Sequence, residues 1–175
     1  LPATETPEEI LPTGAVVYLR ANNVQVLLKN IDSLVTTFVP EKALPPAIQP
    51  FFAKPQPILT LLTTKMFGQP VDASNLSNLI GIALDRPASL AVYPMPPDKG
   101  FVLSVPIANP TLITGMVQSI LMPETVENGT IGNVSYYRVV PSAPNLPREI
   151  YILASEKAVF FCGSSDVAQM LVNSG

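Results

Sequence analysis

The residue types that most often do chemistry are scarce in this sequence. Its 175 residues include no histidine and one cysteine, Cys162. Without histidine the chain cannot form a Ser-His-Asp or Cys-His nucleophilic site, a histidine-ligated zinc site or a histidine proton relay. Glycine-rich phosphate-binding loops and the common serine-nucleophile motifs do not occur either. We therefore expect a protein that is not an enzyme, with no catalytic or metal-ligating residues and no cofactor.

Cys162 stands between a strand-like apolar run and a serine that could cap a helix. The N-terminus of a helix can lower the pKa of a thiol and make it reactive. No histidine or nearby arginine supports a reactive thiol here. We interpret Cys162 as a small buried apolar residue that closes a strand.

The carboxylates are few and separated along the chain. A pair could still assemble in space and act as general acid and base, as in glycosidases. The sequence has no tryptophan to stack on a sugar, so a carboxylate-only hydrolase is the second alternative rather than the main hypothesis. The stretch Asp72-Ala-Ser-Asn75 could bind calcium, but Asp72 as a helix cap is the simpler interpretation.

One short motif has the composition of a protein interface. Tyr136, Tyr137 and Arg138 are consecutive on an expected strand, and tyrosine and arginine are enriched at interface hot spots. Aromatic residues on strands also pack against the neighbouring strand. We favour packing, and we retain the three residues as a tentative interface.

The composition indicates that much apolar surface must be covered. Apolar residues make up 47% of the chain and charged residues 13%, against about 25% charged in an average soluble protein. A protein partner, a missing domain or self-association would each cover such surface. The net charge is −3 and the basic residues are scattered, which argues against nucleic acid and anionic lipid as partners. The longest charge-free stretch, residues 101–123, contains prolines and polar residues, so we expect no transmembrane segment.

Three junctions in the chain share one pattern, in which an apolar strand is followed by a capping residue and an amphipathic helix. The caps are Asn22 or Asn23, Asn109, and Ser164 or Ser165. The helix after the first junction has apolar residues at helical spacing from Val24 to Phe38 and ends before Pro40. The helix after the second runs to about Leu121, and the last one has only about two turns.

The expected elements define an α+β domain. Residues 41–84 are rich in proline and predict helices at 46–53, from Pro57 to Gly68, and from a cap at Asp72 or Ser74 to Gly81. Period-two runs predict strands at 15–20, 89–95, 101–107, 134–140, 149–154 and 158–162. Turns are expected at 96–100, 127–129, 131–133 and 155–157. Because hairpins join these strands, we expect a largely antiparallel sheet with amphipathic helices packed on one face.

The domain organisation follows from the same patterns. Residues 1–12 are rich in proline and glutamate and predict an extended leader or linker. Residues 13–175 are expected to form one domain. The short final helix makes this domain compatible with the first part of a longer protein.

Several apolar motifs resemble one known family. They are the run from Leu11 to Leu19, Gly68-Gln-Pro-Val-Asp72, and Arg86-Pro-Ala-Ser-Leu-Ala-Val-Tyr93. Over about residues 11–172 the chain resembles uncharacterised exported bacterial proteins, grouped as a domain of unknown function, that open with Leu-Pro and an apolar strand. The resemblance implies an extracytoplasmic location and longer chains, and it supplies no active-site residues.

These observations favour a non-enzymatic, extracytoplasmic protein-interaction or structural module. The first alternative is a module that binds an apolar small molecule or a lipid between the sheet and the helices of residues 41–84. The proline content, 20 of 175 residues, fits an exposed and protease-challenged setting.

Overall fold

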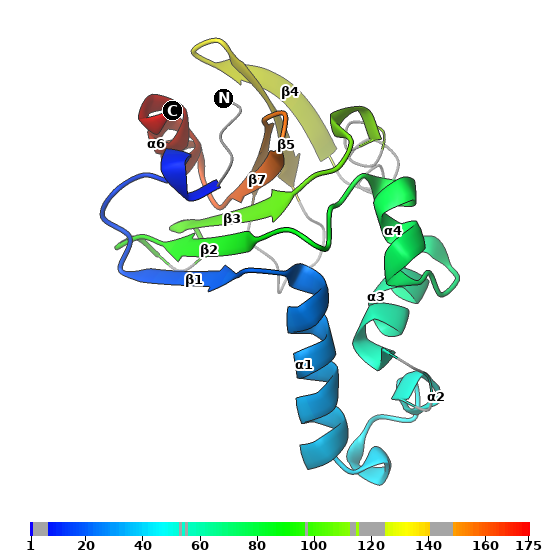
Figure 1. Ribbon diagram of the computed structural model, residues 1–175. Helices are drawn as coiled ribbons and strands as arrows, with labels where there is room; N and C mark the ends of the chain where they lie inside the picture. Colours follow the sequence, from blue (N-terminus) through cyan, green and yellow to red (C-terminus); the bar gives the residue numbers. More distant parts are fainter. Residues whose placement is uncertain are drawn as a thin grey trace.

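A computed structural model describes residues 1, 7–52, 54, 56–96, 98–112, 115, 125–140 and 149–175 of the chain. Its centre is one antiparallel sheet of seven strands (Figure 1). In chain order the strands are β1 (Val17–Ala21), β2 (Ala88–Val92), β3 (Phe101–Pro106), β4 (Thr125–Ile131), β5 (Val134–Val140), β6 (Ile150–Ala154) and β7 (Ala158–Cys162). The α+β class and the antiparallel sheet are confirmed.

The sheet order is β1-β2-β3-β7-β6-β5-β4. Hairpins join β2 to β3 and β6 to β7, as expected, and a third hairpin joins β5 to β4, a strand that the sequence patterns did not predict. The join between the two halves is β3 against β7, in which Val102 lies opposite Cys162 and Ser104 opposite Phe160. This pairing connects segments more than 50 residues apart and has no local sequence signal.

One face of the sheet carries the main core. The short 3-10 helix η1 (Pro7–Ile10) and the helix α6 (Ser165–Ser174) cover this face. Phe160 and Leu153 are fully buried beneath them, and so are three residues of α6 itself, Val167, Ala168 and Leu171. The alternation of strand side chains between the two faces produces this apolar layer.

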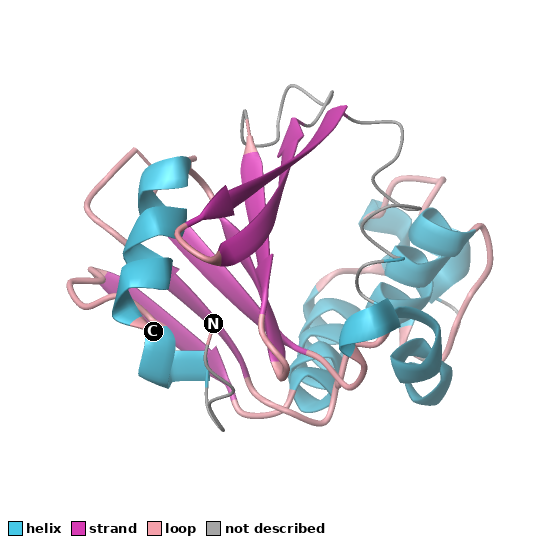
Figure 2. Ribbon diagram, turned by 90° about the horizontal axis from the view of Figure 1, so that it is seen from above, coloured by secondary structure: helices cyan, strands magenta, loops and turns pink. Residues whose placement is uncertain are grey.

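The other helices form a separate group. They are α1 (Val24–Phe38), the short α2 (Gln49–Phe52), α3 (Pro57–Phe67) and α4 (Ala73–Ile80), with a 3-10 turn η2 (Glu41–Ala43). Figure 2 shows this group on the side of the sheet away from α6. A small cluster of Leu59, Val71, Leu76 and Leu84 holds the group together. Of the described helices, α6 packs on the sheet, whereas the main contact of α1 is with α3.

The expected helix caps are confirmed, and they explain where the helices begin. Asn23 Oδ1 accepts a hydrogen bond from the Val26 N–H at 2.9 Å, and Ser164 Oγ accepts one from the Val167 N–H. Asp72 Oδ1 likewise accepts from the Asn75 N–H, which places its carboxylate in the cap role. These side chains satisfy backbone N–H groups that have no partner within the first turn. Gly68, in the left-handed region at φ 73°, ends α3.

Two expectations are wrong. Residues 127–129, expected as a turn, lie within β4 and pair with 136–138 of β5. Residues 1–12 are not extended throughout, because Pro7–Ile10 forms a 3-10 turn and Ile10 is buried in the main core. Of the helix expected after Asn109, Pro110 to Leu112 and Gly115 are helical, and most of the rest lies outside the described residues.

Candidate interaction surfaces

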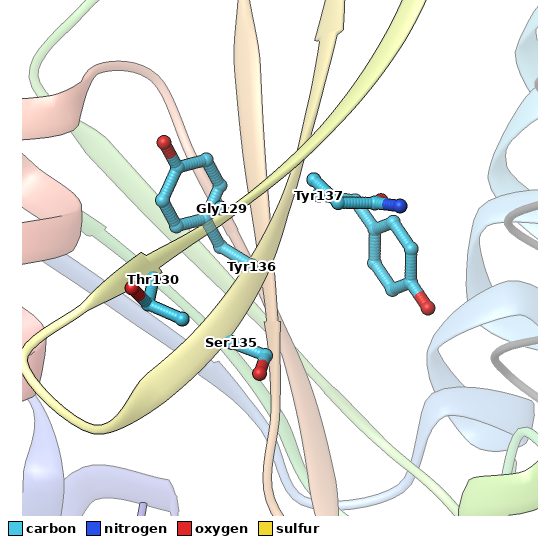
Figure 3. A pocket seen from close by; sticks show the side chains of 6 residues that line it. Gly129, Thr130, Ser135, Tyr136 and Tyr137 are labelled. Carbon is cyan, nitrogen blue, oxygen red and sulfur yellow. The ribbon is translucent and has the colours of Figure 1, made fainter.

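The structure separates the three residues of the tentative interface. Strand alternation places Tyr136 and Arg138 on the face that α6 covers and Tyr137 on the opposite face. Figure 3 shows the two tyrosine rings on opposite sides of the β4–β5 hairpin. One flat partner surface therefore cannot contact all three side chains.

Tyr136 has a packing role within the hairpin. Its ring lies over Gly129, directly across on β4, where a Cβ atom would collide with the phenol. Its ring centroid is also 5.3 Å from that of Tyr151 on β6, with the planes tilted by 52°. Such cross-strand aromatic contacts stabilise sheets, so Tyr136 has the packing role that the sequence favoured.

Arg138 is engaged by two carboxylates on neighbouring strands. Its Nη1 donates to Glu127 Oε2 at 2.7 Å and its Nε to Glu149 Oε2 at 2.9 Å. The hydrogen bonds to Glu149 and then Glu127 raise the pKa of the guanidinium. Glu127 and Glu149 are thus brought together around one guanidinium.

Tyr137 lines a shallow pocket of about 440 Å³ on the hairpin. Asn128 lies directly opposite Tyr137, and Thr130 lies opposite Ser135 one step along the same face. Gly129 and Tyr136 also line the pocket, so polar side chains and two aromatic rings border it. Of the tentative interface residues, Tyr136 and Tyr137 both line this pocket, from opposite sides of the hairpin (Figure 3).

Cys162 is buried beneath α6. Burial raises the pKa of its thiol to about 12, so desolvation outweighs any effect of the nearby helix N-terminus. The phenol of Tyr93 lies in the same core and donates a hydrogen bond to the Pro12 carbonyl at 3.0 Å. Burial also raises the pKa of Tyr93 to about 12. Both groups are structural and neutral at ordinary pH.

Exposed large apolar side chains are concentrated in and beside β1 and α1. Eight of the eleven large apolar side chains that are exposed among the described residues lie between positions 16 and 38. They are Val16, Val17, Tyr18, Leu19, Val26, Leu27, Leu34 and Phe38. β1 is also the first strand of the sheet order, at one edge. We refer to these eight residues as the β1–α1 surface.

Helix α1 is amphipathic, yet its single buried residue is charged. Asp32 is 6% exposed, and its Oδ1 accepts a hydrogen bond from the Ile58 N–H at 2.8 Å. Asp32 thereby caps the N-terminus of α3 from a neighbouring helix, where no side chain of α3 does so. This bond and the half-buried Leu28 turn one flank of α1 toward α3. The apolar residues Leu27, Leu34 and Phe38 lie on an exposed flank.

Two further pockets flank the helical group. One of about 430 Å³ is lined by Gln25, Val26, Lys29, Asp32 and Gln56. The other, of about 450 Å³, is lined by Gln69, Pro70, Val71, Asp72, Asn75, Asn78 and Leu79. Polar side chains occur in both linings, but apolar atoms make up most of the lining of the first pocket and about half of that of the second.

The sequence pattern located α1 but could not show that its apolar face is exposed. A helical period of apolar residues predicts that one face meets other apolar groups. It does not say whether those groups belong to the same chain. The signal that pointed in this direction was compositional, namely few charges and many apolar residues.

Comparisons with known proteins found no relative of this chain. No family model, no curated protein and no solved structure matches the chain. Within the described residues, no helix has the length and apolar character needed to cross a membrane. The same residues contain no group of three or more histidine, cysteine or acidic side chains that could hold a metal ion.

Proposed function

We propose that this chain is a non-enzymatic protein-interaction or structural module and that the β1–α1 surface is where it binds. The observation that carries the proposal is the concentration of eight exposed large apolar side chains within residues 16–38. Monomeric soluble proteins seldom leave contiguous apolar patches larger than a few hundred Å² uncovered. A surface of this kind is typical of one that is covered in an assembly.

The energetics support the same proposal. Each Å² of apolar surface removed from water contributes about 25 cal/mol, so covering one leucine side chain contributes about 1.5–3 kcal/mol. Leu34 is 57% exposed and Phe38 is 75% exposed, and both would gain by being covered. An edge strand such as β1 also offers backbone groups for pairing. The surface thus combines side-chain and backbone features that a partner can use.

The test is to change the surface and to measure association. We expect Leu19→Lys and Leu34→Asp each to reduce association of the chain with itself or with an identified partner, because each places a charge in the contact. Cross-linking mass spectrometry on the native protein should show partner cross-links at Lys29 of α1. The matched control is Lys157, in the β6–β7 turn away from this surface. The proposal is wrong if both variants leave every association of the chain unchanged.

We also propose that the protein works outside the cytoplasm. The resemblance to exported bacterial proteins supports this location, as does the high proline content of the chain. The single cysteine is buried and unpaired, so the fold needs no disulfide and is compatible with an oxidising compartment. The location can be tested by fusing the full-length protein to a reporter that is active only after export. A cytoplasmic-only signal would contradict it.

A further inference from the structure

The apolar residues along the exposed side of α1 have a regular spacing, which is more specific than a general interaction surface requires. Its apolar residues Val24, Leu27, Ile31, Leu34 and Phe38 are separated by alternating steps of three and four. We call these five residues the α1 stripe. This is the heptad spacing by which one helix packs along another. At 1.5 Å per residue the stripe is about 21 Å long.

The stripe is exposed where a second helix could reach it. Leu27 is 43% exposed, Leu34 57% and Phe38 75%, while Val24 and Ile31 are half-buried. α1 meets α3 and the cluster around Leu59 through Asp32 and Leu28 on the adjoining flank, and through Val24 at the first turn of the stripe. A helix docked on the stripe from Leu27 to Phe38 would therefore lie beside α3 without displacing it.

The charges of α1 decide between possible occupants. Lys29 and Asp32 are its two charged residues. Lys29 is two residues from Ile31, about 160° round the helix from the stripe, and Asp32 is turned to α3. The positions that flank the stripe on its free side are Asn23, Asn30 and Thr37. Flanking charges select unlike partners in helix pairs and repel like ones; the stripe has none.

We propose that the occupant of the stripe is α1 of a second copy of this chain, packed antiparallel across a two-fold axis. The apolar residues of a heptad occupy two core positions. In an antiparallel pair, a residue at one core position faces a residue at the other core position of the partner helix. Leu27 then faces Phe38 of the second copy, and Ile31 faces Leu34. The two-fold axis repeats both layers, so four apolar layers form without a charge among them. This inference rests on the proposed interaction function and names its partner.

The first experiment measures dimerisation of the 175-residue chain by sedimentation velocity over a range of concentrations. We expect a reversible dimer that Leu34→Asp weakens at least about a hundredfold, because each dimer would bury two unpaired charges. The matched control is Gln25→Asp, which is exposed on the same helix, is not part of the β1–α1 surface and lies about 120° away from Ile31. It should dimerise like the unmodified chain. Leu34→Gln repeats the test without a charge, and circular dichroism checks that each variant is folded.

The second experiment fixes the direction of the helices. Leu27→Cys and Phe38→Cys proteins are mixed and oxidised; Cys162 is buried and does not interfere. Antiparallel pairing predicts a disulfide between the two variants. It forbids disulfides between identical variants, because like positions are eleven residues, or about 16 Å, apart along the axis. Parallel pairing predicts the reverse.

The outcomes separate this inference from the proposed function. A dimer that Leu34→Asp leaves intact, or that gives disulfides only between identical variants, overturns the antiparallel pair but leaves the interaction function standing. A chain that is monomeric at every concentration overturns the second copy as occupant. If that monomer instead binds neutral lipid vesicles through Leu34, both the inference and the proposed function are wrong.

Discussion

Helices α1 and α6 begin in the same way and end up in opposite environments. Each follows an apolar strand, and each is capped by a side chain that accepts a hydrogen bond from its third residue. In α6 the residues Val167, Ala168 and Leu171 are fully buried against the sheet. In α1 the single buried residue is Asp32. Local sequence therefore decides where a helix starts, whereas the rest of the chain decides whether its apolar face is covered.

The difference assigns the stability of the fold to the covered region, while the interaction that we propose uses the exposed region. The face under α6 contains the larger of the clusters, with Phe160, Leu153 and Val102 at its centre. The β1–α1 surface instead leaves large side chains in water, at a cost of about 25 cal/mol per Å² of apolar area. Substitutions in the two regions should separate these roles.

The largest contrast is expected between Phe160→Ala and Leu34→Ala. Phe160 is fully buried, and removing a buried phenylalanine ring costs about 3–5 kcal/mol through lost burial and the cavity left behind. Leu34 is exposed, so its replacement by alanine should change the free energy of unfolding by less than about 0.5 kcal/mol in a monomer. Urea denaturation at low protein concentration measures both. Equal losses would show that α1 is as well covered as α6 and would remove the distinction between the two regions.

The second contrast uses pH and concerns the core alone. Burial raises the pKa of Cys162 to about 12 from an ordinary value of 9.0, and that of Tyr93 to about 12 from 10.0. Both groups hold their protons more tightly in the folded chain than in the unfolded chain. The stability that this contributes is therefore fully present below pH 9 and is lost as the pH rises toward 12. We expect stability to fall in that window, as followed by circular dichroism against pH. Cys162→Ala should reduce the loss above pH 9.

The same thiol reports how the core opens. At neutral pH Cys162 should react with a thiol reagent only as fast as the core unfolds, because it is fully buried. Leu34→Asp should leave that rate unchanged, whereas Phe160→Ala should raise it. A rapid reaction in the unmodified chain would contradict the burial of Cys162.

A smaller effect is expected where α1 meets α3. Replacing Asp32 by alanine removes the cap on the Ile58 N–H, a change that typically costs about 0.5–2 kcal/mol. The second oxygen of Asp32 is buried without a hydrogen-bond partner, and its removal offsets part of that loss. Asp32→Asn retains an acceptor for the Ile58 N–H and should lose less. If Asp32→Ala is as stable as the unmodified chain, the bond to Ile58 does not contribute in solution.

Much of the fold could be predicted from local sequence, and the failures have physical causes. The caps at Asn23 and Ser164 and the αL glycine at Gly68 were identified because each satisfies backbone groups close to it in the chain. Residues 127–129 have turn chemistry, but pairing with β5 overrides it. Tyr136 covers Gly129 and compensates for the side chain that glycine lacks.

The candidate site was less predictable than the fold. The motif at Tyr136 to Arg138 combined residue types that are common in interfaces, but strand alternation sends Tyr137 to the other face and two glutamates engage Arg138. The α1 stripe was visible as a helical period. Its exposure depends on how α1 leaves β1 and packs on α3, which is a tertiary property that no local pattern contains.

The smallest expected effect lies on β3, the strand between the two regions. Ser104 is fully buried opposite Phe160 on one side and Ser89 on the other, and neither serine hydroxyl has a hydrogen-bond partner among the residues that the structure describes. A buried hydroxyl without a partner destabilises the fold, so Ser104→Ala should leave the free energy of unfolding unchanged or raise it by up to about 1 kcal/mol. Ser155 is the matched control, because its Oγ accepts from the Ala158 N–H at 3.1 Å. Ser155→Ala should lose about 0.5–1.5 kcal/mol. A comparable loss for Ser104→Ala would mean that a buried water hydrogen-bonds to its hydroxyl. The buried serines of β2 and β3 would then stabilise the core.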